Sequence, residues 1–165
     1  MNDRLVVGID NGLTGGMCAL CPVSGNVVAT SAMPVKKNGK RNEICSASLV
    51  DWLNCLDLLV DKVVVEESPA HAPSAASLSS MSISFGKMVG AFEVTGFRVV
   101  RVQVRDWQRE MLGRKIPKGA TKPLALAYAR RRWPDQDWLA SARCKTPHDG
   151  IVDAALIALY GSGLK

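Results

Sequence analysis

Two short, continuous apolar runs constrain this fold more than any other feature of the sequence. Residues 5–9 read LVVGI and end at Asp10, and residues 61–67 hold three consecutive valines before Glu66 and Glu67. A strand that is buried on one face alternates apolar and polar residues, whereas an unbroken apolar run fits a strand covered on both faces. The two runs therefore predict buried strands with helices packed on both sides of their sheet.

The remaining elements predict an α/β fold in one domain spanning residues 1–165. Strands at 17–20 and 27–33 flank a turn sequence, Ser24-Gly25-Asn26, so the first three strands form an antiparallel meander. Strands at 61–67 and 97–104 complete a mixed five-stranded sheet, in which two parallel strands follow the three antiparallel ones. Helical spacing of apolar residues and capping signals predict helices at 49–59, 82–95, 106–112, 122–132 and 147–161. Polar composition predicts loops at 34–42 and 68–80.

Composition excludes several other classes of protein. With 47% apolar and 22% charged residues, the 165-residue chain is neither disordered nor collagen-like. No apolar run approaches the ~18 residues of a membrane helix, and the start of the chain lacks a secretory segment, so we expect a soluble, cytoplasmic protein. Five cysteines without an export signal predict reduced thiols. The Cys18 and Cys21 pair lacks a second close pair, which disfavours a zinc site.

The charge is distributed unevenly along the chain. The net charge is +6, but residues 98–145 carry thirteen basic and four acidic side chains, and the remainder is net negative. A basic segment beside acidic residues favours a polyanionic partner such as nucleic acid. A solvated helical face without a partner remains the alternative interpretation.

Four carboxylates stand at the ends of apolar elements. Asp10 and Glu66 each end a predicted strand, and the carboxyl ends of parallel strands meet at one edge of a sheet. Asp149 and Asp153 are four residues apart, on one face of the last helix. Two such charges 4 Å apart repel by about 4 kcal/mol at an effective dielectric of ~20. We therefore expect Mg²⁺ or Mn²⁺, two ions per site, and metal-assisted phosphodiester hydrolysis.

Each carboxylate also has a structural interpretation. Asp10 precedes Asn11-Gly12 and could begin a turn. Glu67 competes with Glu66, because adjacent strand residues face opposite ways. Asp149 follows Thr146 at the spacing of a capping box, so it could cap the last helix. His148 is a candidate for positioning or activating a water, and a surface role is its alternative.

These residues resemble the RuvC-type Holliday-junction resolvases of the RNase H-like superfamily over nearly the whole chain. Gly8-Ile9-Asp10-Asn11-Gly12 is similar to the first motif of that family, which usually has proline in place of Asn11, and Val64-Val65-Glu66-Glu67-Ser68 is similar to the second. Residues 84–87 and 104–108 resemble further stretches, and residues 148–156 resemble the final motif. The resemblance assigns the catalytic carboxylate to Glu66. The last two acids of the best-studied resolvases are three apart, whereas Asp149 and Asp153 are four apart, so either Asp149 or His148 fills the third position.

The resemblance implies an RNase H-like fold, a homodimer, and paired nicking of four-way or branched DNA that leaves 5′-phosphate and 3′-hydroxyl ends. A glycine-containing loop of the family carries a basic DNA contact, which implies DNA binding by Lys122 and Lys118. Composition adds Arg114, Lys115 and Arg131. Residues 69–71 offer no aromatic wedge for unstacking bases. The alternatives are a ribonuclease H or another nuclease of the superfamily, and a non-catalytic module that binds branched DNA.

Overall fold

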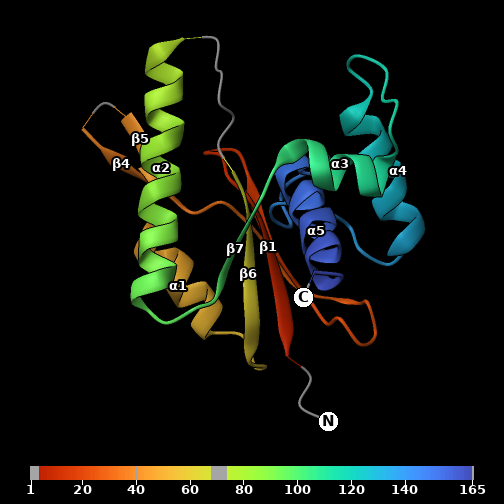
Figure 1. Cartoon of the computed structure of the whole chain (residues 1–165), viewed down its shortest axis with the longest axis horizontal. Helices are drawn as coiled ribbons and strands as arrows, with labels where there is room; N and C mark the ends of the chain where they lie inside the picture. Colours follow the sequence, from red (N-terminus) through yellow and green to blue (C-terminus); the bar gives the residue numbers. More distant parts are fainter. Residues whose placement is uncertain (1–3, 40, 68–73, 165) are drawn as a thin grey trace.

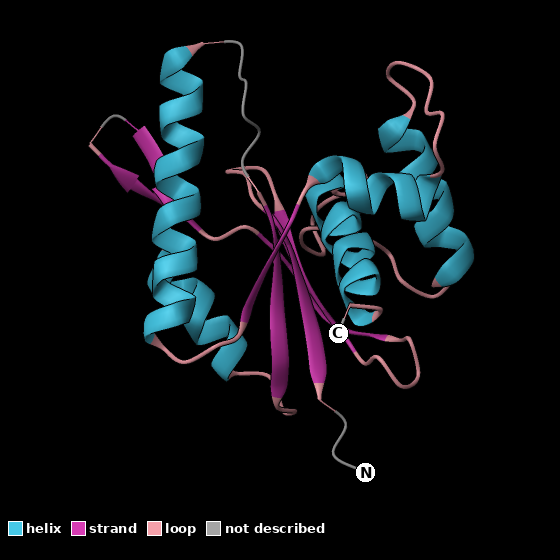
Figure 2. Cartoon of the chain, in the orientation of Figure 1, coloured by secondary structure: helices cyan, strands magenta, loops and turns pink. Residues whose placement is uncertain are grey.

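The computed structural model describes residues 4–39, 41–67 and 74–164. Its main feature is a sheet that lies between two groups of helices (Figure 1, Figure 2). The strands are β1 (Leu5–Asp10), β2 (Gly16–Leu20), β3 (Val27–Ala32), β4 (Val35–Asn38), β5 (Arg41–Ile44), β6 (Val60–Glu66) and β7 (Val99–Val102). The helices are α1 (Ser46–Asn54), α2 (Ala75–Val94), α3 (Val104–Leu112), α4 (Thr121–Arg132) and α5 (Asp149–Ser162).

The sheet has the predicted mixed topology. Its five strands lie in the order β3-β2-β1-β6-β7. The β1–β2 and β2–β3 pairs are antiparallel, and the β1–β6 and β6–β7 pairs are parallel. The two apolar runs of the sequence form the adjacent strands β1 and β6, so the prediction of a mixed α/β sheet with helices on both faces is confirmed.

Each face of the sheet has its own apolar core. Val6, Cys18 and Val64 face the helices α3, α4 and α5, whereas the flanking residues Val63 and Val65 face α1 and α2. Because alternate residues of β6 enter different cores, its three consecutive valines at 63–65 are all buried. None of the helices in the described ranges has the length and apolar character needed to cross a membrane.

Four predictions are wrong in their bounds. The strand predicted at 97–104 is shorter, because β7 spans Val99–Val102 and α3 already begins at Val104. Residues 34–42 are not a plain loop, because β4 and β5 pair there as an antiparallel hairpin with Lys36 opposite Glu43. Helix α2 begins at Ala75, well before the predicted start, because the Ser74 side chain accepts a hydrogen bond from the Ser77 amide and caps the helix. Helix α1 ends at Asn54, so Leu59 lies outside it.

Gly8, in the middle of β1, allows α5 to lie directly on the sheet. A Cβ atom at this position would overlap the backbone carbonyl oxygen of Ala154 and the backbone nitrogen of Ala158. No side-chain rotation can relieve a clash with backbone atoms. The close contact between β1 and α5 therefore depends on glycine at position 8, and it fixes the helix that carries Asp149 and Asp153.

We expect Gly8→Ala to lower the free energy of unfolding by about 3 kcal/mol, because the added methyl group forces β1 and α5 apart. Urea denaturation of the purified variant measures this effect. Gly86→Ala is the matched control, since a Cβ atom there meets nothing within 4 Å and alanine favours the helix by about 1 kcal/mol. Equal stability of the two variants would contradict the close packing of α5 on β1.

Candidate active site

The register of β1 and β6 brings Asp10 and Glu66 to one edge of the sheet. Ile9 pairs with Val65 in these parallel strands, and Asp10 and Glu66 are the next residues. Neighbouring strands lie about 4.8 Å apart, so the two carboxylates begin from adjacent backbone positions. Both residues are half-buried. The predicted meeting of these two carboxylates at the strand ends is present in the structure.

The start of α5 brings the other two carboxylates to the same edge. Gly15, in the turn after β1, forms a parallel bridge with Gly150, and a Cβ atom on either glycine would overlap the backbone. Asp149 is the first residue of α5, and Asp153 lies one turn further along the same side. The side chain of Asp149 is 50% exposed, whereas Asp153 is half-buried.

Burial and mutual repulsion oppose ionisation of three of these acids. Burial first, and then the charge of Glu66, raise the pKa of Asp10 to about 7. Burial and the charge of Asp10 raise the pKa of Asp153 to about 7. Burial also raises the pKa of Glu66 to about 7, with a smaller contribution from Asp153. Carboxyl groups that share one site and resist ionisation are typical of functional centres.

Lys122 supplies the positive charge nearest to this cluster. Its Nζ atom lies 2.6 Å from Oδ2 of Asp149, and its charge acts to lower the pKa of both Asp10 and Asp153. The hydrogen bond and charge of Asp149 in turn raise the pKa of Lys122. Lys122, predicted from the sequence as a DNA contact, therefore lies among the carboxylates at the beginning of α4.

Trp107 is a part of the site that the sequence analysis missed. Its indole Nε1 donates a hydrogen bond of 2.7 Å to Oε2 of Glu66, and this bond acts to lower the pKa of Glu66. The Trp107 side chain is 1% exposed and is held in the core between α3 and the sheet. A fixed donor on one carboxylate oxygen orients the group.

In the structure, His148 is the N-cap residue of α5. Its Nδ1 accepts a hydrogen bond of 3.3 Å from the Ile151 amide, and its own amide donates to the carbonyl of Trp138. A neutral imidazole that accepts at Nδ1 carries its proton on Nε2. The proposed capping box is wrong, because His148, rather than Thr146, is the cap and Asp149 is the first helical residue.

Glu67 does not join the cluster. The charges that raise the pKa of Asp10 belong to Glu66 and Asp149, and the charge that raises the pKa of Glu66 belongs to Asp153. The backbone amide of Glu67 continues the sheet by donating to the Val102 carbonyl. Of the two adjacent glutamates, it is Glu66 that the structure places with the other acids.

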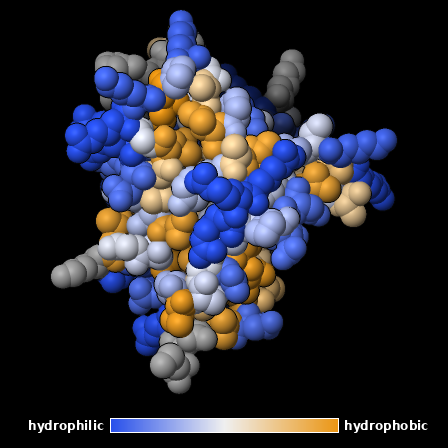
Figure 3. Space-filling model, turned by 90° about the vertical axis from the view of Figure 1, so that its right-hand side faces the viewer, coloured by the Kyte–Doolittle hydropathy of each residue, from blue (hydrophilic) through white to orange (hydrophobic). Residues whose placement is uncertain are grey.

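The predicted basic DNA contacts divide between two places. Arg114, Lys115 and Lys118 are exposed in the segment that joins α3 to α4, which extends beyond the two helices at the upper right of Figure 1. Arg131 lies at the opposite end of α4, about 14 Å along the helix from Lys122, with its guanidinium 5.4 Å from the ring centroid of Tyr128. Hydrophobic patches interrupt the hydrophilic surface on this side of the molecule (Figure 3), so it is not a continuous basic face.

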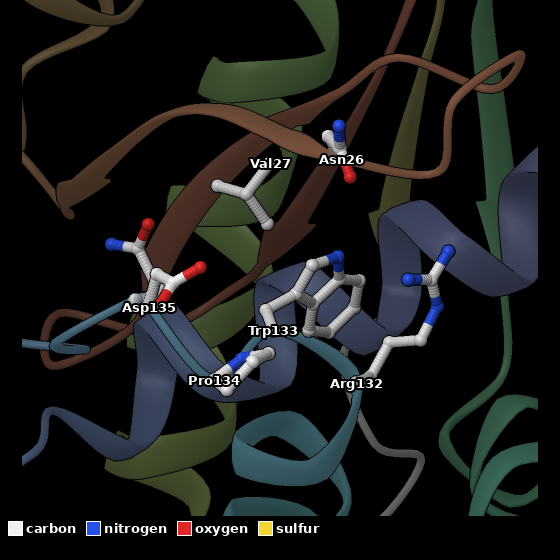
Figure 4. A pocket seen from close by; sticks show the side chains of 7 residues that line it. Asn26, Val27, Arg132, Trp133, Pro134 and Asp135 are labelled. Atoms are coloured by element: carbon white, nitrogen blue, oxygen red, sulfur yellow. The ribbon is translucent and has the colours of Figure 1, made fainter.

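A hollow lies away from the carboxylates, beside the β2–β3 turn. It is a cavity of about 300 Å³, lined by Asn26, Val27 and residues 132–136 (Figure 4). The indole of Trp133 at this place donates a hydrogen bond to the Gly25 carbonyl. The lining contains Asp135 as its single acid, so this hollow lacks the paired carboxylates on which hydrolytic chemistry would depend.

The carboxylate oxygens of the cluster are suitable ligands for a divalent cation, although the side chains do not surround one metal position. Among the residues that the structure describes, no three His, Cys, Asp or Glu side chains are arranged to enclose a metal ion. Mg²⁺ is commonly held by one or two carboxylates with waters and substrate phosphates completing its shell. The buried oxygens of Asp10, Glu66 and Asp153 match that requirement, and a cation would relieve the repulsion that raises their pKa values.

We expect the metal-free protein to lose stability as the pH rises from about 4 to about 7. In the unfolded chain these carboxyl groups titrate near pH 4, whereas in the fold Asp10, Glu66 and Asp153 hold protons to about pH 7. The folded state therefore binds more protons across this range, and the free energy of unfolding falls by several kcal/mol as the pH rises. Chemical denaturation in EDTA at pH 5 and pH 8 measures the fall. Mg²⁺ added at pH 8 should restore stability, and a metal-free stability that rises with pH would contradict this account.

Comparisons with known proteins show the fold. No family model matches the chain, and no curated protein sequence is similar to it. The chain is similar in structure to RuvC of T. thermophilus in complex with a Holliday junction, with a TM-score of 0.62, 16% identity, and coverage of 94% of this chain and 90% of that one. It is also similar to Thermus thermophilus RuvC alone, with a TM-score of 0.54, 18% identity, and coverage of 94% and 92%. A Fowlpox virus resolvase bound to Holliday junction DNA matches with a TM-score of 0.50, 10% identity, and coverage of 94% and 99%. The chain therefore has the RuvC-type, RNase H-like fold.

Proposed function

We propose that the chain is a structure-selective DNA endonuclease that resolves Holliday junctions or other branched DNA. The observation that carries this proposal is the cluster of Asp10, Glu66, Asp149 and Asp153 at the carboxyl ends of the central strands, where three pKa values are raised to about 7. Its fold is that of two resolvases whose structures contain Holliday junction DNA, which agrees with this assignment.

In this proposal Asp10, Glu66 and Asp153 hold two Mg²⁺ or Mn²⁺ ions, and Asp149 is their exposed neighbour. The bound ions would supply a nucleophilic water and would neutralise charge on the departing 3′ oxygen, leaving 5′-phosphate and 3′-hydroxyl ends. Trp107 orients Glu66 through its indole hydrogen bond. Lys122 holds Asp149 and compensates the negative charge of the cluster, and its exposed ammonium group is available to an incoming phosphate.

The proposed reaction also favours a homodimer. Resolution of a four-way junction needs two symmetric nicks, and the described part of one chain holds a single cluster of this kind, around Asp10. A two-fold axis places two identical sites on the two strands to be cut. Light scattering of the eluted protein measures the mass of the assembly, and we expect twice the 17.7 kDa of the chain.

Two other functions remain to be compared by experiment. A ribonuclease H would use the same carboxylates on an RNA–DNA hybrid, and a non-catalytic module would bind branched DNA without cutting it. The burial of Asp10 and Glu66 disfavours the non-catalytic module. Buried like charges destabilise the fold unless a cation or a proton neutralises them, and binding of DNA alone does not require these acids. Calorimetric titration separates the two classes, since a binding module need not take up Mg²⁺ or Mn²⁺.

The deciding experiment offers the purified chain four substrates in parallel, with and without Mg²⁺. These are a four-way junction, a three-way junction, a linear duplex and an RNA–DNA hybrid, each labelled at one end. We expect paired, Mg²⁺-dependent nicks in the four-way junction and little cutting of the linear duplex. Preferential cutting of the hybrid would overturn the proposal in favour of a ribonuclease H.

A further inference from the structure

The β4–β5 hairpin is a basic element that extends from the active-site edge of the sheet. Ala32, the last residue of β3, pairs with Gly16, and Gly16 pairs with Asp10, so β3 ends at the edge that holds the carboxylates. The Met33 amide then donates to the Gly15 carbonyl, and β4 begins at Val35. In Figure 1 the hairpin and the basic segment between α3 and α4 lie on opposite sides of the strand ends.

A groove separates the hairpin from the first half of α2. It has a volume of about 300 Å³. Seven of its nine lining residues are polar or charged, including Asn38, Arg41, Asn42, Ser79 and Ser80, and the other two are Ala76 and Ile83. The guanidinium, amide and hydroxyl groups of these residues are hydrogen-bond donors of the kind that contact phosphate oxygens. The groove is open to solvent on the side away from the core, because Arg41 and both serines are exposed.

The single acid of the groove is already neutralised. Glu43 lies 2.6 Å from Nζ of Lys87 and 3.5 Å from Nζ of Lys36, and Asn38 donates a third contact of 3.3 Å. Within the described ranges no ion pair engages Arg41 or Lys37. Lys87 and the cations of the hairpin therefore outnumber the one carboxylate of the groove, and the surplus positive charge belongs to exposed side chains.

We propose that this groove, together with Lys37 on the hairpin, binds the phosphate backbone of a duplex arm of the branched DNA. The inference rests on the proposed function and adds a second basic contact, on the side of the strand ends opposite the α3–α4 segment that carries Lys118. Branched DNA that lay over the carboxylates would then be held from both sides. A phosphate backbone fits the groove better than an apolar partner does, because most of the lining groups are polar or charged.

The test measures how salt affects binding of a four-way junction by the double variant Lys37→Gln/Arg41→Gln. Fluorescence anisotropy without divalent cations gives the slope of log Kd against log salt while cleavage is suppressed. Loss of two phosphate contacts should lower the magnitude of that slope by about 2. Arg4→Gln is the control for the loss of a positive charge as such. Arg4 pairs with Asp61 at the opposite end of the strands, so its replacement should leave the slope unchanged.

A second measurement shortens the arms of the junction. Removing arm length should weaken binding by the wild-type chain more than binding by the double variant, because only the wild type retains the arm contact. An unchanged slope in the double variant, or equal losses on shortening, would overturn the groove assignment and leave room for an acidic protein partner there. If the wild-type chain fails to bind the junction, the proposed function and the groove assignment fail together.

Discussion

Replacing Asp10 with asparagine is expected to slow junction cleavage roughly a thousandfold, which corresponds to about 4 kcal/mol of lost transition-state stabilisation. Asparagine keeps the shape of the side chain and removes the charge that would attract a divalent cation. Asp10 is half-buried, and Glu66 and Asp153 lie close enough for their charges to interact with it. Its loss therefore affects the whole cluster. Initial rates of nicking on a labelled four-way junction in Mg²⁺ measure the effect.

Junction binding should survive the same change. DNA is held by basic side chains, and the neutral residue removes negative charge from the surface that meets the phosphates. At pH 8 without metal, Asp10→Asn should also be more stable than the wild type, because it relieves the repulsion from Glu66. Asp51→Asn, an identical change at an exposed position on α1, should retain full activity. Full cleavage by Asp10→Asn would contradict the assignment of this carboxylate to the reaction.

The buried strands were predictable because their sequence leaves few alternatives. An unbroken valine run at 63–65 is stable only where both faces are covered, and the structure places its members in two different cores. The β4–β5 hairpin could not be predicted in this way. All four residues of β4 are exposed and only Ile44 of β5 is buried, so the apolar alternation that indicates a strand is absent. Pairing across the hairpin, rather than burial, holds these residues in strands.

The candidate site was predictable to the extent that it depends on strand ends and helix spacing. Asp10 and Glu66 follow from the ends of parallel strands, and Asp153 from its distance along the helix after Asp149. Contacts that depend on the packing of distant elements were not predictable. The capping of α5 by His148 and the pairing of Lys122 with Asp149 join groups whose approach is decided by how α4 and α5 lie against the sheet. The hydrogen bond from Trp107 on α3 to Glu66 on β6 is of the same kind.

That last contact leads to a second large effect. We expect Trp107→Phe to weaken binding of Mn²⁺ or Mg²⁺ by about 10- to 100-fold, the usual consequence of removing a group that orients a metal ligand. Phenylalanine preserves an aromatic ring in the core and deletes the indole N–H. Oε2 of Glu66 then loses its hydrogen bond from Trp107, and this donor no longer orients the carboxylate. Calorimetric titration of the DNA-free protein measures the affinity independently of cleavage.

Trp133→Phe provides a matched control for this prediction, because it deletes a second buried indole N–H whose acceptor is not a carboxylate. The Trp133 donor bonds to the Gly25 carbonyl at 2.8 Å, beside the β2–β3 turn and away from every carboxylate of the cluster. Both variants lose one hydrogen bond and a similar volume from the same core, so their stabilities should fall by comparable amounts. Metal affinity should fall in Trp107→Phe alone. Equal metal affinities in the two variants would show that Trp107 fills the core without orienting Glu66.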